Sequence, residues 1–220
     1  KDSNTGEVLK EALMGKRGAG SETILPLAHS NDGLYTELDI TWHDIKLKVQ
    51  SCSDKKEISI LVTPLEANRN GNVLISPSEI WWDREGKTSI AGNQLLFDLP
   101  SGKISLYALG RSATNRDSAI TCLAFSAGAE IILSTENGLS AADIREKIAK
   151  AKEKHTTNKN KYGENSELYH AMQNALAWNV IYDPEGQREL TTVSRLWNMY
   201  RGGFVIFCWD NYFVSYMHSI

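Results

Sequence analysis

Residues 34–50 read LYTELDITWHDIKLKVQ, and this stretch decides the fold class. Two runs within it, residues 34–42 and residues 44–50, alternate apolar and polar side chains. In the second run the isoleucine, leucine and valine point to one face and the two lysines between them point to the other. A β-strand with one buried face requires this period of two. The stretch therefore predicts two half-buried strands.

The same character continues through the first two thirds of the chain. Six further runs are typical of short strands: Glu57–Leu65, Asn72–Trp82, Gln94–Leu99, Lys103–Leu109, Ala119–Phe125 and Glu130–Ser134. Turn residues such as Pro100-Ser101-Gly102 separate them. Seven or eight strands without a helical stretch between them predict antiparallel sheets packed as a β-sandwich. Residues 1–20 are expected to be a loose lead-in.

After residue 137 the period changes to that of helices. Ser140 followed by Asp143 predicts an N-cap and a helix whose narrow apolar stripe includes Ile144 and Ile148. Residues 155–165 are polar and are expected to be a linker. A second helix is predicted at about residues 166–180, and a third begins at about Asn211.

Between these last two helices, Asp183-Pro184-Glu185-Gly186 fits a turn joining Ile181–Tyr182 to Gln187–Leu190 as a hairpin. We therefore expect three parts: a β-sandwich domain at 1–137, a helical linker at 138–165, and the start of a helical domain at 166–220.

The composition excludes several classes of function. The 220 residues carry a formal net charge of −3, and 41% of them are hydrophobic. Without an excess of positive charge, neither nucleic acid nor an anionic membrane is an expected partner. The histidines and cysteines lack metal-ligand spacing, so we predict no metal site and no cofactor. A disulfide between Cys52 and Cys122 stays open as an alternative to free thiols.

Four segments near the end of the chain resemble a known family. They are AWN at 177–179, IYDPEG at 181–186, VSRLW at 193–197 and GGFVIFCWDNYF at 202–213. Together they are similar to the start of the catalytic domain of glycoside hydrolase family 63, which includes processing glucosidase I and mannosylglycerate hydrolases. The resemblance implies a mainly β fold with helices: an N-terminal antiparallel β-sandwich, a helical linker and an (α/α)6 barrel that cleaves α-glycosidic bonds with inversion.

The same resemblance sets what this chain is expected to do. Inversion requires an acid and a base carboxylate roughly 6.5–9.5 Å apart, and in the family both lie well downstream of the Trp-Asp motif. The chain ends ten residues after Asp210, so we expect a truncated barrel. We therefore predict no catalytic residues here and no hydrolysis by this chain alone.

The predicted substrate-binding residues cluster around Asp210. By analogy with the family, Asp210 binds the sugar in the −1 subsite, although its position before a helix also fits a simple N-cap. Trp209 and Tyr212 offer flat apolar surface for a sugar ring. Trp197 and Tyr200 are predicted as further walls of the pocket, with core packing as the alternative. Arg195 is predicted as a partner for a carboxylate near the pocket, with solvent exposure or pairing with Asp183 as the alternative.

Two hypotheses of different class follow. In the first, the chain is the N-terminal part of an inverting α-glycosidase that acts on carbohydrate. An unfilled apolar face of Leu176, Phe207, Phe213 and Met217 would then favour self-association or a second chain that completes the barrel. In the second, the chain is a non-catalytic β-sandwich module that binds carbohydrate or a protein. The glycosidase resemblance favours a periplasmic or secreted location. His43, at a junction between strands, is expected to be structural.

Overall fold

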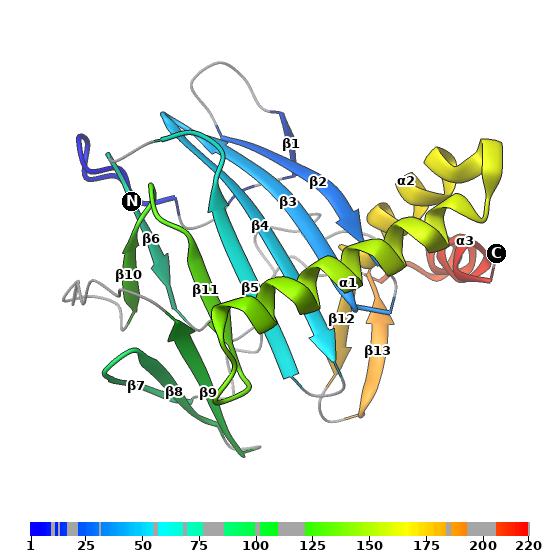
Figure 1. Cartoon of the computed structure of the whole chain (residues 1–220). Coiled ribbons are helices and arrows are strands. Elements are labelled where there is room, and N and C mark those ends of the chain that lie inside the picture. Colours follow the sequence, from blue (N-terminus) through cyan, green and yellow to red (C-terminus); the bar gives the residue numbers. More distant parts are fainter. Residues whose placement is uncertain are drawn as a thin grey trace. The chain divides into compact units, whose positions relative to one another are not determined.

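The computed structural model of this chain is mainly β with helices, as predicted (Figure 1). It describes residues 1–9, 12, 14–16, 22–30, 32–54, 57–67, 70–76, 86–99, 102–109, 122–183, 186–192 and 206–219. The chain divides into two compact units. The first comprises Lys1–Leu27 and Leu34–Lys152, and the second comprises Ala28–Gly33 and Glu153–Ile220.

One wide antiparallel sheet dominates the first unit. Within the described residues it has nine strands in the order β1-β2-β3-β4-β5-β11-β9-β8-β7. Their bounds, from one edge to the other, are β1 Gly15–Lys16, β2 Thr23–His29, β3 Tyr35–Trp42, β4 Ile45–Asp54, β5 Glu57–Pro64, β11 Ile131–Ser134, β9 Gly102–Leu109, β8 Gln94–Leu99 and β7 Lys87–Ala91. The neighbours β5 and β11 are far apart in sequence, so the centre of the sheet depends on pairing between distant segments of the chain.

Most of the predicted strands are confirmed to within a few residues. The differences lie mainly at the edges. β2 and β7 were not predicted, and the expected loose lead-in contains β1 and a β-bridge between Asp2 and Gly71. In the run predicted at 72–82, the first four residues form β6, Asn72–Ile75, and residues 77–82 lie outside the described part. The run predicted at 119–125 becomes β10, Leu123–Ser126, while residues 119–121 also lie outside it.

The β3–β4 hairpin follows directly from the opening sequence. Its register joins Trp42 to Ile45 across a two-residue loop. His43 in that loop has a φ of 51°, the left-handed region that a tight two-residue hairpin loop requires at its first position. With the register fixed at the loop, the alternation of the two strands places their apolar residues on the same face.

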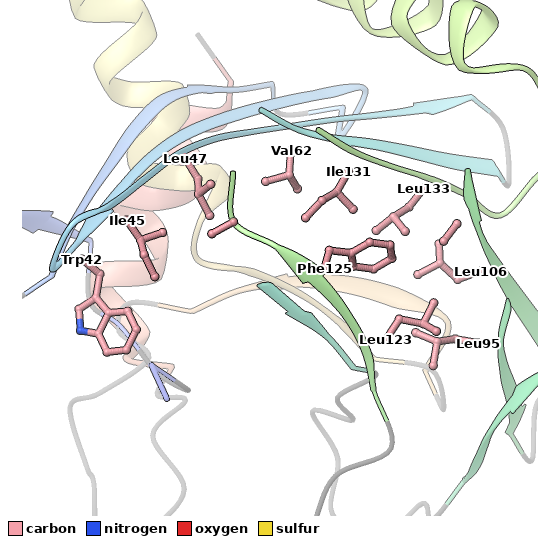
Figure 2. Close-up of a cluster of buried hydrophobic side chains, with 12 residues drawn as sticks. Trp42, Ile45, Leu47, Val62, Leu95, Leu106, Leu123, Phe125, Ile131 and Leu133 are labelled. Atoms are coloured by element: carbon pink, nitrogen blue, oxygen red, sulfur yellow. The ribbon is translucent and has the colours of Figure 1, made fainter. Parts of the chain in front are cut away.

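A smaller pair of strands, β6 and β10, covers that apolar face. The pair is antiparallel, and its side chains belong to one cluster with those of the large sheet. Figure 2 shows Phe125 of β10 next to Ile131 and Leu133 of the sheet, and Leu123 of β10 beside Leu95 of β8. Leu123 and Leu133 have no exposed surface. The first unit therefore has two β layers, and in the described residues the second layer consists of two strands.

Helix α1 spans Ala141–Asn160, and its residues 141–152, which belong to the first unit, cover the opposite face of the large sheet (Figure 1). Its predicted capping box is confirmed, because the Asp143 N–H donates to Ser140 Oγ at 3.2 Å and the Ser140 N–H donates to the Asp143 carboxylate at 2.8 Å. Ile144 and Ile148 are buried, as the apolar stripe predicted. The helix continues through residues 155–160, which were predicted as linker; Lys, His, Asn and Thr are compatible with a helix even where no apolar stripe is present.

A buried carboxylate joins α1 to the sheet. Glu37 of β3 accepts hydrogen bonds from Tyr35 Oη at 2.5 Å and Lys48 Nζ at 2.8 Å, and Lys152 Nζ of α1 lies 2.8 Å from it. Burial by itself would raise the pKa of Glu37, but the bonds from Lys152, Lys48 and Tyr35 outweigh burial and lower the pKa to about 2. Burial raises the pKa of Tyr35 well above its usual range, and its bond to Glu37 adds to that.

The second unit contains the end of α1 and a series of short elements. They are the 3₁₀ turn η1 Gly163–Asn165, α2 Ser166–Ala177, β12 Val180–Asp183, β13 Arg188–Thr191 and α3 Cys208–His218. The predicted hairpin is confirmed as β12–β13, in which the Gly186 N–H donates to Asp183 Oδ1 at 3.1 Å. The sequence pattern of α2 predicts one stripe of Leu168, Met172, Ala175 and Asn179. This prediction is wrong at Leu168, which is 62% exposed.

Two further findings concern the chain as a whole. No helix in the described residues is long and apolar enough to cross a membrane. Cys52 and Cys122 are both buried and are not bonded to each other, so the alternative of a disulfide between them is wrong for this structure. Burial raises the pKa of the Cys52 thiol.

We predict that stability in acid depends on Glu37. A carboxyl group whose pKa is lowered on folding stabilises the fold above its unfolded pKa, and this contribution is lost as the pH falls through the folded value. Between about pH 4.5 and pH 2, protonation of Glu37 should cost about 1–2 kcal/mol of unfolding free energy, after allowance for screening by solvent. Urea unfolding followed by circular dichroism across this range measures the slope.

In the same titration, Glu37→Gln should flatten the dependence on pH. The control is Glu66→Gln, which removes an exposed carboxylate paired with Lys46 at 2.6 Å and should leave the slope unchanged. Equal slopes for the wild type and Glu37→Gln would contradict the assigned role of Glu37.

We also predict that Leu133→Ala lowers the unfolding free energy by about 3 kcal/mol, because it opens a cavity where β11 meets β10. Ile58→Ala is the matched control. Ile58 lies on β5, which pairs directly with β11, but is 44% exposed, so its loss should cost less than about 1 kcal/mol. Equal losses in the two variants, measured by chemical denaturation, would show that the cluster in Figure 2 is not the stabilising core.

Candidate functional site

The candidate site lies on α3, which begins three residues earlier than predicted. Phe207 is extended, with φ −110° and ψ 135°, and its carbonyl accepts the first helical hydrogen bond from the Asn211 N–H at 2.9 Å. The N-cap position is therefore Phe207, and the alternative of Asp210 as N-cap is wrong. Asp210 lies in the first turn, where a carboxylate is favoured by the helix dipole.

Helix α3 is fixed to the hairpin by one residue of β13. Asn211 Nδ2 donates to the Thr191 carbonyl oxygen at 2.9 Å, and His218 Nε2 lies 3.2 Å from Thr191 Oγ1. The next residue, Thr192, is buried, and both its N–H and its hydroxyl donate to the Asn179 carbonyl oxygen, at 2.9 and 3.0 Å. The end of α2, the hairpin and α3 are thus connected by a continuous set of hydrogen bonds.

The opposite side of α3 carries four exposed aromatic side chains. Trp209, Tyr212, Phe213 and Tyr216 are 73%, 72%, 69% and 67% exposed. Their spacing of i, i+3, i+4 and i+7 places them on one side of a helix. We call these four residues the aromatic face of α3. Contiguous apolar surface of this kind marks a site where something binds.

Asp210 lies at the border of the aromatic face. At about 100° per residue it is roughly 60° around the helix from Phe213 and roughly 100° from Trp209, and it is partly buried. The carboxylate therefore lies beside the rings rather than among them. A carboxylate next to flat apolar surface can accept hydroxyl hydrogen bonds from a ligand that stacks on the rings.

The other predicted site residues have different outcomes. Arg195, Trp197 and Tyr200 lie outside the described residues. Trp178, at the C-cap of α2, was not predicted as a site residue, and it packs edge-on against His29 with ring centroids 4.5 Å apart. Tyr216 was not predicted as a site residue, although its spacing of seven from Trp209 was a usable signal.

The predicted unfilled apolar face is confirmed only in part. Phe207 and Phe213 are exposed, and Met217 is partly buried. Leu176 was predicted to belong to this face, but it is only 4% exposed. The large apolar side chains that α3 exposes are accordingly aromatic and are those at 209, 212, 213 and 216.

One carboxylate of the hairpin, that of Asp183, has structural partners. Asp183 Oδ2 lies 3.1 Å from Arg188 Nε, and Asp183 Oδ1 accepts from the Gly186 N–H. Asp183 is therefore a turn residue, as predicted. In the part of the chain that the structure describes, no group of three or more histidine, cysteine or acidic side chains could hold a metal ion.

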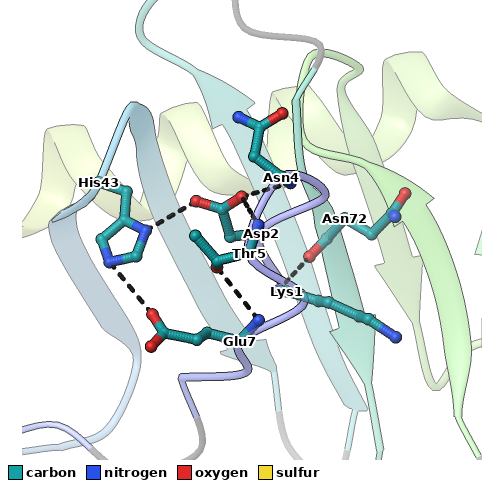
Figure 3. Close-up of polar contacts among 7 residues, drawn as sticks. All are labelled: Lys1, Asp2, Asn4, Thr5, Glu7, His43 and Asn72. Atoms are coloured by element: carbon teal, nitrogen blue, oxygen red, sulfur yellow. Dashed lines mark hydrogen bonds and ion pairs between the residues drawn. The ribbon is translucent and has the colours of Figure 1, made fainter.

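A separate polar cluster surrounds His43 in the first unit (Figure 3). His43 Nδ1 lies 2.7 Å from Asp2 Oδ2, and His43 Nε2 lies 3.5 Å from Glu7 Oε2. The Asp2 carboxylate also accepts from the N–H groups of Asn4 and Thr5. The bond with His43, followed by the two backbone bonds, lowers the pKa of Asp2. These contacts hold residues 2–7 against the β3–β4 loop, a structural role of the kind expected for His43.

No protein-family model matches this chain, and no curated protein matches it. The likeness to glycoside hydrolase family 63 therefore rests on the four segments quoted from residues 177–213.

Proposed function

We propose that this chain is the N-terminal portion of an inverting α-glycosidase similar to glycoside hydrolase family 63, and that α3 supplies part of its carbohydrate-binding surface. The observation that carries the proposal is the aromatic face of α3, bordered by Asp210. This face coincides with the segment in which the sequence resemblance is most specific.

The chemistry of a sugar matches such a surface. One face of a pyranose ring presents C–H groups, which pack on flat aromatic rings, while its hydroxyls need hydrogen-bond partners at the rim. Trp209 and Tyr212 provide the rings, and Asp210 provides acceptors that form charge-assisted hydrogen bonds with two hydroxyls. Binding would also remove from water apolar surface that is now exposed, which is favourable by roughly 25 cal/mol per Å².

The architecture expected for such an enzyme is compatible with the elements described above. The two β layers of the first unit would correspond to the N-terminal β-sandwich. Helices α2 and α3 would be the first helices of the (α/α)6 barrel, with Arg195, Trp197 and Tyr200 in the segment before α3. In this proposal Asp210 holds the sugar of the −1 subsite, and the acid and base carboxylates belong to later barrel segments. This chain alone is therefore expected to bind and not to hydrolyse.

Binding should depend on the aromatic face of α3. We expect Trp209→Ala and Tyr212→Ala each to weaken binding of an α-linked glucose or mannose disaccharide by roughly fivefold, equivalent to about 1 kcal/mol. Asp210→Asn should weaken it further, because the charge-assisted hydrogen bonds are lost. Isothermal titration calorimetry measures the three affinities.

The matched control is Tyr182→Ala, which removes an aromatic side chain that is 57% exposed on β12 of the same unit. It should leave the affinity unchanged. If the wild-type chain binds and all four variants bind equally well, the sugar site lies elsewhere, as the hypothesis of a β-sandwich module requires. If the wild-type chain binds neither disaccharide, the proposed function is wrong.

A further inference from the structure

The contacts of α3 with the hairpin lie on the side of the helix away from its aromatic face. At about 100° per residue, Asn211 and His218 lie roughly 150–170° around the helix from the middle of that face. Both contact Thr191, one through its carbonyl oxygen and the other through its hydroxyl. These two contacts lie about two helical turns apart, so together they fix the rotation of α3 about its own axis.

Rotation decides which side chains of α3 are exposed. If the helix turned by one residue, about 100°, Asp210 would move away from the border of the aromatic face. The packing of Val214 and Met217, both partly buried, favours the observed rotation only weakly, because their apolar surface resembles that of Phe213. The hydrogen bonds to Thr191 are directional and distinguish one rotation from another.

We propose that Asn211 and Thr191 are positioning residues that set the rotation of α3 and so place Trp209, Tyr212 and Asp210 for carbohydrate. This inference rests on the proposed function for the identity of the ligand. Asn211 acts through the helix and does not touch the sugar. Its Nδ2 donates to Thr191, and its Oδ1 is buried without a hydrogen-bond partner among the described residues.

The connection continues beyond Thr191 into α2. Thr192 is only 1% exposed and is bonded twice to the Asn179 carbonyl oxygen, immediately after α2. A displacement of α3 would therefore strain a short series of backbone-anchored bonds. A rigid connection of this kind is what a binding surface on a helix of three turns needs, because side chains must be held within a fraction of an ångström to bind a ligand well.

The test combines a binding measurement with one that needs no ligand. Asn211→Ala should weaken binding of the α-linked glucose or mannose disaccharide by roughly three- to tenfold and should speed amide hydrogen exchange in residues 208–219. Asn211→Gln keeps the amide donor and should recover most of both. Thr191→Val removes only the hydroxyl contact with His218 and should have a smaller effect of the same sign.

The control is Ser215→Ala. Ser215 is exposed, and its hydroxyl donates to the Asn211 carbonyl oxygen within α3 at 2.8 Å, so its loss leaves the contacts with the hairpin intact. Hydrogen exchange and binding should both match the wild type. The indole N–H resonance of Trp209, identified by its loss in Trp209→Phe, should shift in Asn211→Ala and return in Asn211→Gln.

The outcomes separate this inference from the proposed function. If the wild type binds sugar and Asn211→Ala binds equally well, the inference is overturned and the proposed function stands. If the wild type binds no sugar, the proposed function is wrong, and hydrogen exchange still tests the positioning. Faster exchange in Asn211→Ala with recovery in Asn211→Gln then supports the positioning role, while unchanged exchange overturns it.

Discussion

A wide antiparallel sheet with one apolar face must have that face covered, and the rest of the first unit depends on this constraint. The pair β6–β10 meets it by placing Leu123 and Phe125 against Val62 and Leu133. Because protein interiors are close-packed, the strands that contribute to this one are held in one register. The opposite face of the sheet, where Tyr35, Leu61 and Ile132 are also buried, is then available for α1, whose buried side chains are Ile144 and Ile148. The hydrogen bonds of Glu37 fix how α1 lies on the sheet. Hydrogen bonds require a particular geometry, whereas a small apolar contact does not.

The sequence allowed the central strands to be predicted because their alternation is strict. Residues 35–64 combine period-two patterning with short turns, and each expected strand is present. The edge strands were missed for identifiable reasons. Thr23–His29 contains Pro26 and places Leu25 and Leu27 on an exposed side, so its pattern is not that of a half-buried strand. The pairing of β5 with β11 joins segments roughly seventy residues apart, and no local pattern encodes such a partner.

For the candidate site, the sequence was enough to predict which residues are involved. It was not enough to predict which way their side chains face. Trp209 and Tyr212 are exposed as a binding role requires, but the start of α3 at Cys208 shifted Asp210 from the cap into the first turn. The exposure of Tyr216 depends on the rotation of α3, which in turn depends on Thr191, twenty residues before Asn211. A contact between a strand residue and a helix on the far side of a long connection leaves no periodic signal in the sequence. Spacing alone therefore identifies a face of a helix but not the side on which it meets the protein.

The register of the β3–β4–β5 meander has a consequence for how this chain can change over evolutionary time. Eight successive residue pairs join β3 to β4, and eight more join β4 to β5. Inserting or deleting a single residue within these strands would exchange their two faces: Lys46 and Lys48 would enter the core, and Ile45 and Leu47 would move to the opposite face. A substitution, in contrast, changes one side chain and leaves the register of the two faces intact. Homologous chains should therefore differ here in identity but hardly ever in length, and their gaps should gather in the connections between strands.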